Sequence, residues 1–373
     1  MTKANACIID CDPGIDDTLA ILHAMGSPKV DLKAITLCFG NTNRANVTRN
    51  LFTILHVLGK EVSAERIASL PAGPNRDRLE HIRTKRPVVS VGAEAPLSAL
   101  AKNGEYFHGA DGLGGLHLND PDLAPSDWAE ILGLLDPERQ HGKEAEPNTI
   151  TVIGIGPLTN LAMAYEKDPV TFSRCKRVIC MGGALGVPGN ATPVAEFNFY
   201  ACPDSVHTML QATAHKDPAK SIKLYMLPTN VTKQVPLEST VLEQYVKPLE
   251  TPLSRFAIEL FRHLFDLLLA EFHHTSMSLH DPLCIGFFID LEDETISDVA
   301  QVGWQVEEQD VRIETQGLLT RGMLVVDRRL KSQNPASGSM SRTRVVLKAD
   351  PARYLASMLH DVWGVTNYKT GSQ

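Results

Sequence analysis

The feature that most constrains this chain is a group of four aspartates directly after a short apolar run. Residues 6–9 have the unbroken apolar character of a buried strand, and a Pro-Gly pair at 13–14 ends it. Asp10 and Asp12 share one face if the strand continues. Asp16 and Asp17 then open an apolar helical run, where carboxylates are favoured. Ligands of open α/β sheets bind at the carboxyl ends of strands, so this stretch predicts a functional site.

Four carboxylates this close repel one another and need protons, cationic side chains or a metal. No Lys or Arg occurs in residues 6–27, and oxygen-only ligands suit a hard cation such as Ca²⁺ or Mg²⁺. A helix cap with exposed acids would explain Asp16 or Asp17 alone, but it explains the whole quartet less well. An EF-hand is excluded, because Ile15 and Ile21 occupy the positions that need Gly and Glu.

The order of strand and helix patterns predicts the fold class. A second strand is expected at residues 32–39 and a helix at 46–58, and further strands at 149–153 and 177–181. This βαβα order predicts an α/β fold with an open, mostly parallel central sheet and helices on both faces. The 373 residues are interpreted as one large domain. Surface insertions are expected at 61–87, 119–148 and 331–342.

Other polar residues follow predicted strands or lie in glycine-rich loops. Asn41 comes after the second strand, and His108 opens a glycine-dense stretch that could move as a flap. Asn190, Glu196 and Asn198 lie within nine residues and could bond hydroxyl groups. Each has an ordinary alternative explanation, since Asn favours turns and polar loops are often merely ordered.

His280 and Asp281 form a second informative pair. Pro282 disfavours a helix at Asp281, which predicts a non-helical entry to the following helix. A His beside an Asp suits acid–base work or metal ligation, although an isolated dipeptide is a weak signal. His273 and His274 follow a long apolar-striped helix expected at 253–272, and they also fit a solvated helix end.

The stretch Asp10-Cys11-Asp12-Pro13-Gly14-Ile15-Asp16-Asp17 resembles the N-terminal signature of the inosine-uridine-preferring nucleoside hydrolases. Over residues 6–326 the remaining motifs follow that family's order. They are Gly40-Asn41, His108-Gly109, Gly156-Pro157-Leu158-Thr159-Asn160, Gly189-Asn190 with Glu196-Phe197-Asn198, and His280-Asp281. The resemblance implies a nucleoside hydrolase-like domain, a tightly bound Ca²⁺, and hydrolysis of the N-glycosidic bond of ribonucleosides. It also implies a homodimer or homotetramer.

The same resemblance implies a role for each site residue. The metal ligands would be Asp12, Asp17, Asp281 and the backbone carbonyl of Ile155, where the family commonly has Thr. Asp12 would also be the general base that acts on a metal-bound water, and His280 the acid that protonates the leaving base. The sugar hydroxyls would be held by Asp16, Asn41 and Asn198 at the 2′ and 3′ positions, and by Asn190 and Glu196 at the 5′ position. His108 would lie near the base, and Asp10 would orient the other acids from behind.

Elementary chemistry supports these roles. Cleaving a ribosyl N–C bond produces an oxocarbenium-like sugar and an anionic base. Carboxylates stabilise the first, and a histidine that titrates near neutrality can protonate the second. Base preference stays open, because residues 253–277 contain no Tyr, although inosine-uridine enzymes usually carry an aromatic hydroxyl there. Leaving-group activation could therefore also involve His273, His274 or His108.

Two other functions fit parts of the pattern. A Mg²⁺-dependent phosphatase of the haloacid dehalogenase type also has Asp-x-Asp after a first strand, but it prefers Thr or Val at Gly14 and leaves Asp16-Asp17 unexplained. A non-catalytic, calcium-dependent nucleoside- or sugar-binding protein would have no use for His280.

Composition limits the partners and the compartment. A net charge of −8 argues against nucleic-acid binding, but not against a small ribonucleoside. No signal-peptide pattern or apolar run of membrane-spanning length is seen, so no membrane association is expected. Seven scattered cysteines without CxxC spacing indicate reduced thiols in a cytoplasmic protein.

Overall fold

A computed structural model describes residues 4–98, 104–114, 126–127, 134, 148–328 and 341–369. Within them, a nine-stranded sheet has the order β10-β13-β7-β6-β5-β1-β2-β3-β4. Its strands are, in that order, Gln305–Gln309, Thr343–Lys348, Leu224–Leu227, Arg177–Met181, Ile150–Gly154, Asn5–Cys11, Val30–Leu37, Val88–Val91 and Ser126–Asp127. Only β10, at one edge, runs antiparallel to its neighbour. The predicted open, mostly parallel sheet is confirmed.

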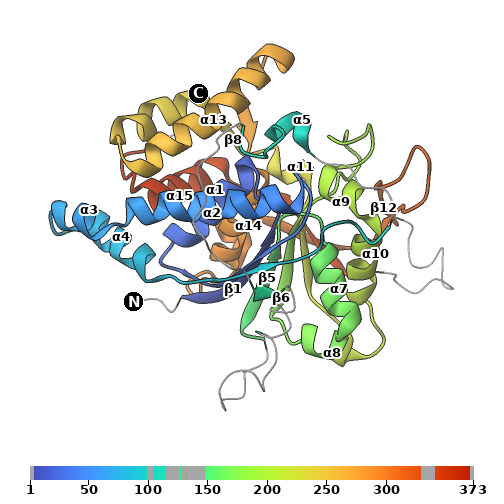
Figure 1. Cartoon of the computed structure of the whole chain (residues 1–373). Helices are drawn as coiled ribbons and strands as arrows, with labels where there is room; N and C mark the ends of the chain where they lie inside the picture. Colours follow the sequence, from blue (N-terminus) through green and yellow to red (C-terminus); the bar gives the residue numbers. More distant parts are fainter. Residues whose placement is uncertain are drawn as a thin grey trace.

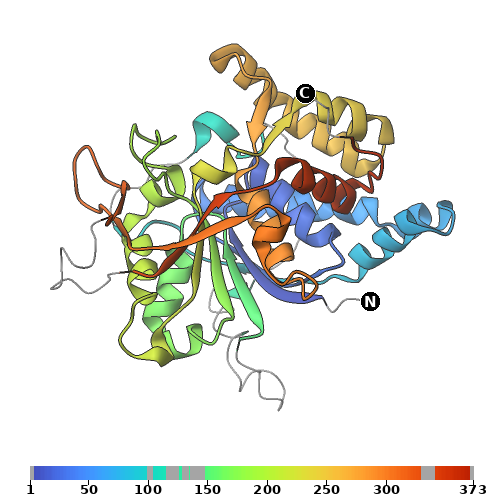
Figure 2. The same cartoon turned by 180° about the vertical axis from the view of Figure 1, so that it is seen from behind.

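Helices cover both faces of the sheet, as Figures 1 and 2 show. One face carries α1 (Ile15–Gly26), α2 (Arg44–Glu61), α13 (Pro252–Phe272), α14 (His280–Leu291) and α15 (Pro351–Trp363). The other carries α7 (Thr159–Lys167), α8 (Pro169–Phe172) and α10 (Pro203–Ala212). In β1, Cys7 and Ile9 belong to the core on the first face and Ile8 to the core on the second. This alternation follows from the two-residue repeat of a strand, and it explains why β1 is apolar throughout.

Shorter elements complete the described chain. The helices are α3 (Ala64–Ser69), α4 (Pro74–Thr84), α5 (Glu105–His108), α9 (Phe197–Ala201), α11 (Thr229–Thr232) and α12 (Ser239–Val241). Single turns of other helix types lie at Pro218–Lys220, Leu242–Val246, Lys247–Leu249 and Val299–Val302. Two small antiparallel pairs are β8 (Pro236–Glu238) with β9 (Ser276–Ser278), and β11 (Val311–Ile313) with β12 (Leu324–Val326). Among the described helices, none has the length and apolar character needed to cross a bilayer.

Most of the surface insertion expected at 61–87 forms helices α3 and α4. Ile67 of α3 and Leu79 and Ile82 of α4 are buried in the main core. With so few buried positions, the apolar repeat is too sparse to reveal these helices in the sequence. The other two expected insertions lie largely outside the described residues, which include only 126–127, 134 and 148 of the second and 341–342 of the third.

The topology brings several predicted site residues to one edge of the sheet. Asp12 follows β1, Asn41 follows β2 and Ile155 follows β5, and these three parallel strands are neighbours. Helices α1 and α14 pack together on one face, and both begin at this edge. The carboxyl edge of the sheet is therefore the candidate site, as expected for an open α/β fold.

Candidate active site

Three carboxylates converge where α1 and α14 begin. Asp16, Asp17 and Asp281 each offer an oxygen, and these oxygens lie within 4.8 Å of one another. Two of these residues open α1 and the third opens α14, so the contact depends on the packing of the two helices. The group differs from the predicted ligand set, since it includes Asp16 and not Asp12.

Asp12 lies beside this group in a network of backbone and side-chain hydrogen bonds. Its carboxylate accepts from the Asn41 backbone N–H at 2.7 Å, and its own backbone N–H donates to Asp17 at 3.1 Å. The side-chain amide of Asn41 donates to Asp17 Oδ2 at 2.9 Å and to the Asp12 carbonyl at 3.0 Å. Gly14 N–H also donates to Asp17 Oδ2, at 3.1 Å. Asn41 thus joins the end of β2 to the acids that follow β1.

The acids are buried without a neutralising side chain. Burial raises the pKa of Asp17 to about 7 and the pKa values of Asp12 and Asp281 well above the usual range. Within the described residues, no Lys or Arg forms an ion pair with these three. Asp16 Oδ1 is buried and has no hydrogen-bond partner. Converging carboxylates, one of which has a buried oxygen without a hydrogen-bond partner, fit a hard cation bound at this position.

Asp10 lies behind these acids, within the sheet. Its Oδ1 accepts from the side-chain amide of Asn160 at 2.7 Å and from the hydroxyl of Thr36, while Oδ2 is buried without a partner. Burial raises the pKa of Asp10 to about 7. The hydrogen bonds link β1 to β2 and to α7, which is consistent with the supporting role predicted for Asp10.

The predicted sugar-binding residues after β6 are held by hydrogen bonds to nearby backbone groups. Glu196 accepts from the backbone N–H groups of Gly183 and Asn198, both at 2.8 Å, and caps α9. Its burial raises the pKa of Glu196 to about 7. Asn190 Oδ1 accepts from the Phe197 N–H at 2.8 Å. The Asn198 side chain donates to the carbonyl of Ile155 at 2.8 Å, so it contacts one of the predicted metal ligands.

Two of the predicted histidines lie at the site. His108 Nδ1 accepts from the Ile15 N–H at 3.2 Å, and its Nε2 is 4.0 Å from Asp16. Nδ1 of His280 is 2.6 Å from the Thr232 hydroxyl. Burial lowers the pKa of both histidines. By contrast, His273 and His274 are exposed at the end of α13.

The predicted non-helical entry at His280 and Asp281 is wrong. Both residues belong to the first turn of α14, and Pro282 is its third residue. A proline is tolerated there because the first N–H groups of a helix have no partner within the helix.

Sequence reasoning missed the polar residues that hold the site from behind. Thr232, Thr36 and Asn160 are all fully buried and bond to His280 or Asp10. Asn160 ends the family motif that follows β5, but no role was assigned to it. Nothing local marks Thr232, since its partner is 48 residues away.

Comparison with known proteins decides the family. The family model for inosine-uridine preferring nucleoside hydrolases matches residues 7–356. The inosine-uridine preferring nucleoside hydrolase of Leishmania major is 30% identical over 344 residues, covering 92% of each chain. The chain belongs to the inosine-uridine preferring nucleoside hydrolase family. The pyrimidine-specific ribonucleoside hydrolase RihA of Escherichia coli O7:K1 is 32% identical over 326 residues, covering 86% of this chain and 88% of the relative.

Solved nucleoside hydrolases share the fold. A plant nucleoside hydrolase gives a TM-score of 0.74 at 23% identity, and an inosine-guanosine nucleoside hydrolase gives 0.75 at 23%. Each comparison covers 96% of this chain and 98% of the other. The predicted enzyme class, a ribonucleoside hydrolase acting on N-glycosyl bonds, is confirmed. The phosphatase and the non-catalytic binding protein are not favoured.

Proposed function

We propose that this nucleoside hydrolase cleaves ribonucleosides of the inosine and uridine type to ribose and free base in a calcium-dependent reaction. The observation that carries the proposal is the convergence of Asp16, Asp17 and Asp281 within 4.8 Å, with buried Asp12 beside them. Membership of the family supports the reaction class, and the group of acids supports this position for the reaction.

The proposed calcium ligands are Asp12, Asp17, Asp281 and the carbonyl oxygen of Ile155. Their all-oxygen character and the absence of a paired cation among the described residues support this choice. Bound calcium would hold the sugar hydroxyls and lower the pKa of a water molecule. Asp16 offers an oxygen to the same group of carboxylates, so it is close enough to contact calcium as well as the sugar.

Asp12 is the proposed general base. It is buried, and one oxygen accepts the Asn41 N–H at 2.7 Å, which fixes the orientation of the carboxylate. A Cβ atom at position 156 would lie 2.4 Å from the other oxygen, Asp12 Oδ1. Only glycine at position 156 therefore leaves space beside Oδ1. The carboxylate would accept the proton of the attacking water, and neighbouring acids would stabilise the cationic sugar.

Two of the residues proposed to hold the ribose already contact candidate metal ligands. Asn41 and Asn198, with Asp16, are proposed for the 2′ and 3′ hydroxyls, and both amides contact candidate metal ligands. Asn190 and Glu196 are proposed for the 5′ hydroxyl. The Glu196 carboxylate already accepts three backbone N–H groups, so its position is firmly set before any sugar binds.

His280 is the proposed acid for the leaving base. It opens α14 immediately before Asp281, so the acid and a metal ligand are held by one helix. His108 would face the base from α5, where its Nε2 is 4.0 Å from Asp16. His273 and His274 are exposed at the end of α13, so they have weaker support as the acid for the leaving base.

A homodimer or homotetramer in the cytoplasm is proposed as the working form. All seven cysteines are free and buried, which is consistent with a reducing compartment.

Incubation with inosine, uridine and a phosphate monoester tests the function. Release of hypoxanthine or uracil together with ribose, abolished by Asp12→Asn, supports the proposal. Release of phosphate, or of no product with calcium present, would overturn it.

A further inference from the structure

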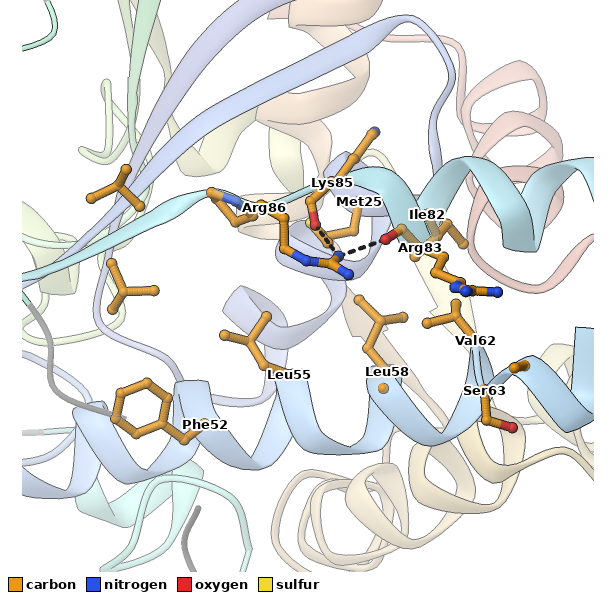
Figure 3. A pocket seen from close by; sticks show the side chains of 15 residues that line it. Met25, Phe52, Leu55, Leu58, Val62, Ser63, Ile82, Arg83, Lys85 and Arg86 are labelled. Carbon is orange, nitrogen blue, oxygen red and sulfur yellow. Dashed lines mark hydrogen bonds between the residues drawn. The ribbon is translucent and has the colours of Figure 1, made fainter. Parts of the chain in front are cut away.

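The acids lie at the carboxyl ends of the parallel strands. A large pocket lies toward the amino-terminal ends of these strands. It has a volume of about 700 Å³ and is shown in Figure 3. Met25, at the far end of α1 from Asp16, forms part of it, as does Val88, the first residue of β3. The apolar lining comes mainly from α2 and the end of α4, and includes Phe52, Leu55, Leu58, Val62 and Ile82.

All charged residues that line this pocket are basic. They are Arg83, Lys85 and Arg86, and the fifteen lining residues include no acid. The Lys85 ammonium is already hydrogen-bonded within the protein, since it donates to the carbonyls of Ala24 and Ser27 at 2.8 and 2.7 Å. Arg86 donates to two backbone carbonyls through Nη1 alone, so its Nη2 and Nε groups can still donate, and the Arg83 side chain has no partner among the described residues. Two exposed guanidinium groups therefore border an apolar cavity without a carboxylate partner in the described chain.

We propose that this pocket binds an amphipathic carboxylate, with its apolar body against Phe52, Leu55 and Leu58 and its carboxylate at Arg83 and Arg86. The volume lies in the range of small-molecule sites, which are mostly apolar with a few polar groups that orient the ligand. Guanidinium groups bind carboxylates through paired N–H donors. In a chain of net charge −8, a local concentration of cations without acids favours an anion.

Calorimetry with dodecanoate, below the concentration at which it forms micelles, tests this site. We expect about one dodecanoate per chain, with affinity lowered at least about tenfold in the Arg83→Ala/Arg86→Ala variant. Arg76→Ala removes a charge from the same helix outside the pocket and should bind like wild type. Leu55→Glu, checked by thermal unfolding, should lose binding. No binding to wild type, equal binding of dodecanol, or equal losses in Arg76→Ala and the double variant would overturn the proposal.

A second inference concerns the proposed acid and rests on the proposed function. Thr232 is fully buried on α11, and its hydroxyl is 2.6 Å from His280 Nδ1. In the imidazolium form that would act as the acid, Nδ1–H would donate to the Thr232 hydroxyl oxygen, and Nε2–H would be the proton passed to the leaving base. We infer that Thr232 is a positioning residue that keeps the Nε2–H of His280 directed at the leaving base.

Leaving-group dependence separates this role from simple support of the fold. Thr232→Val should slow inosine turnover about tenfold or more, because orientation of the acid is lost, while nitrophenyl riboside needs no proton and should stay within about twofold. Thr232→Ser should restore inosine turnover. Equal slowing of both substrates, or a Ser variant as slow as Val, would overturn the inference. A wild type inactive on both ribosides would instead overturn the proposed function, and the role of Thr232 with it.

Discussion

The side-chain amide of Asn198 donates a hydrogen bond to the backbone carbonyl of Ile155 at 2.8 Å. These are a proposed sugar-binding residue and a proposed metal ligand, from α9 and from the turn after β5. A carbonyl oxygen has two lone pairs, so it can accept this hydrogen bond and still face a cation. The proposed sugar-binding and metal-binding roles therefore meet at one oxygen.

Asn198→Ala should impair both functions at this oxygen. We expect the KM for inosine to rise about tenfold, and calcium affinity to fall about tenfold or more because the ligand loses its orienting partner. Steady-state kinetics and calcium titration measure the two effects. A variant with a raised KM and unchanged calcium affinity would show that the contact does not orient the ligand.

The purified protein should contain about one Ca²⁺ per chain, since the proposed ligands are all oxygens. Asp17→Ala should remove both metal and activity, whereas Asp77→Ala, an exposed acid in the first turn of α4, should keep both. Elemental analysis provides the measurement. Zinc in place of calcium, or full activity without metal, would contradict the proposal.

Asp12→Asn should reduce turnover by at least about a thousandfold, because the side chain is both the proposed base and a proposed ligand. Turnover of inosine at saturating calcium measures the loss. Activity within about tenfold of wild type would place the base elsewhere.

His280→Ala should slow inosine hydrolysis by about 10²–10⁴-fold and leave nitrophenyl riboside nearly unchanged, because nitrophenolate leaves without a proton. Asp281→Ala should impair both substrates, since its proposed role is to bind calcium. Equal slowing of both substrates by His280→Ala would assign the acid to another histidine, with His108 the one already beside Asp16.

Lys85 should make stability depend on pH. Burial lowers the pKa of its ammonium from 10.5 to about 8 in the folded chain. Between these values the folded state binds fewer protons than the unfolded state, so the free energy of unfolding rises with pH from about 8 to about 10.5. Urea unfolding should show this rise in wild type relative to Lys85→Met. Parallel pH profiles for the two proteins would contradict the assignment.

Local patterns were enough for much of the fold. The limits of β6 match the predicted 177–181, and α13 differs by one residue from the predicted 253–272. These elements have continuous apolar runs or a broad apolar stripe, which are visible within a short window. By contrast, neither α15 nor α4 is predicted from the sequence, and only two residues of α4 are buried.

By itself, the sequence determined the fold class, the family and the cluster of acids after β1, because each depends on residues that are adjacent or regularly spaced. Only the tertiary structure decided which oxygens converge. Asp281 joins Asp16 and Asp17 because α14 packs on α1, and Thr232 reaches His280 because α11 packs beside α14. Distant pairs such as these depend on how whole helices pack against the sheet, and no local spacing in the chain records that packing.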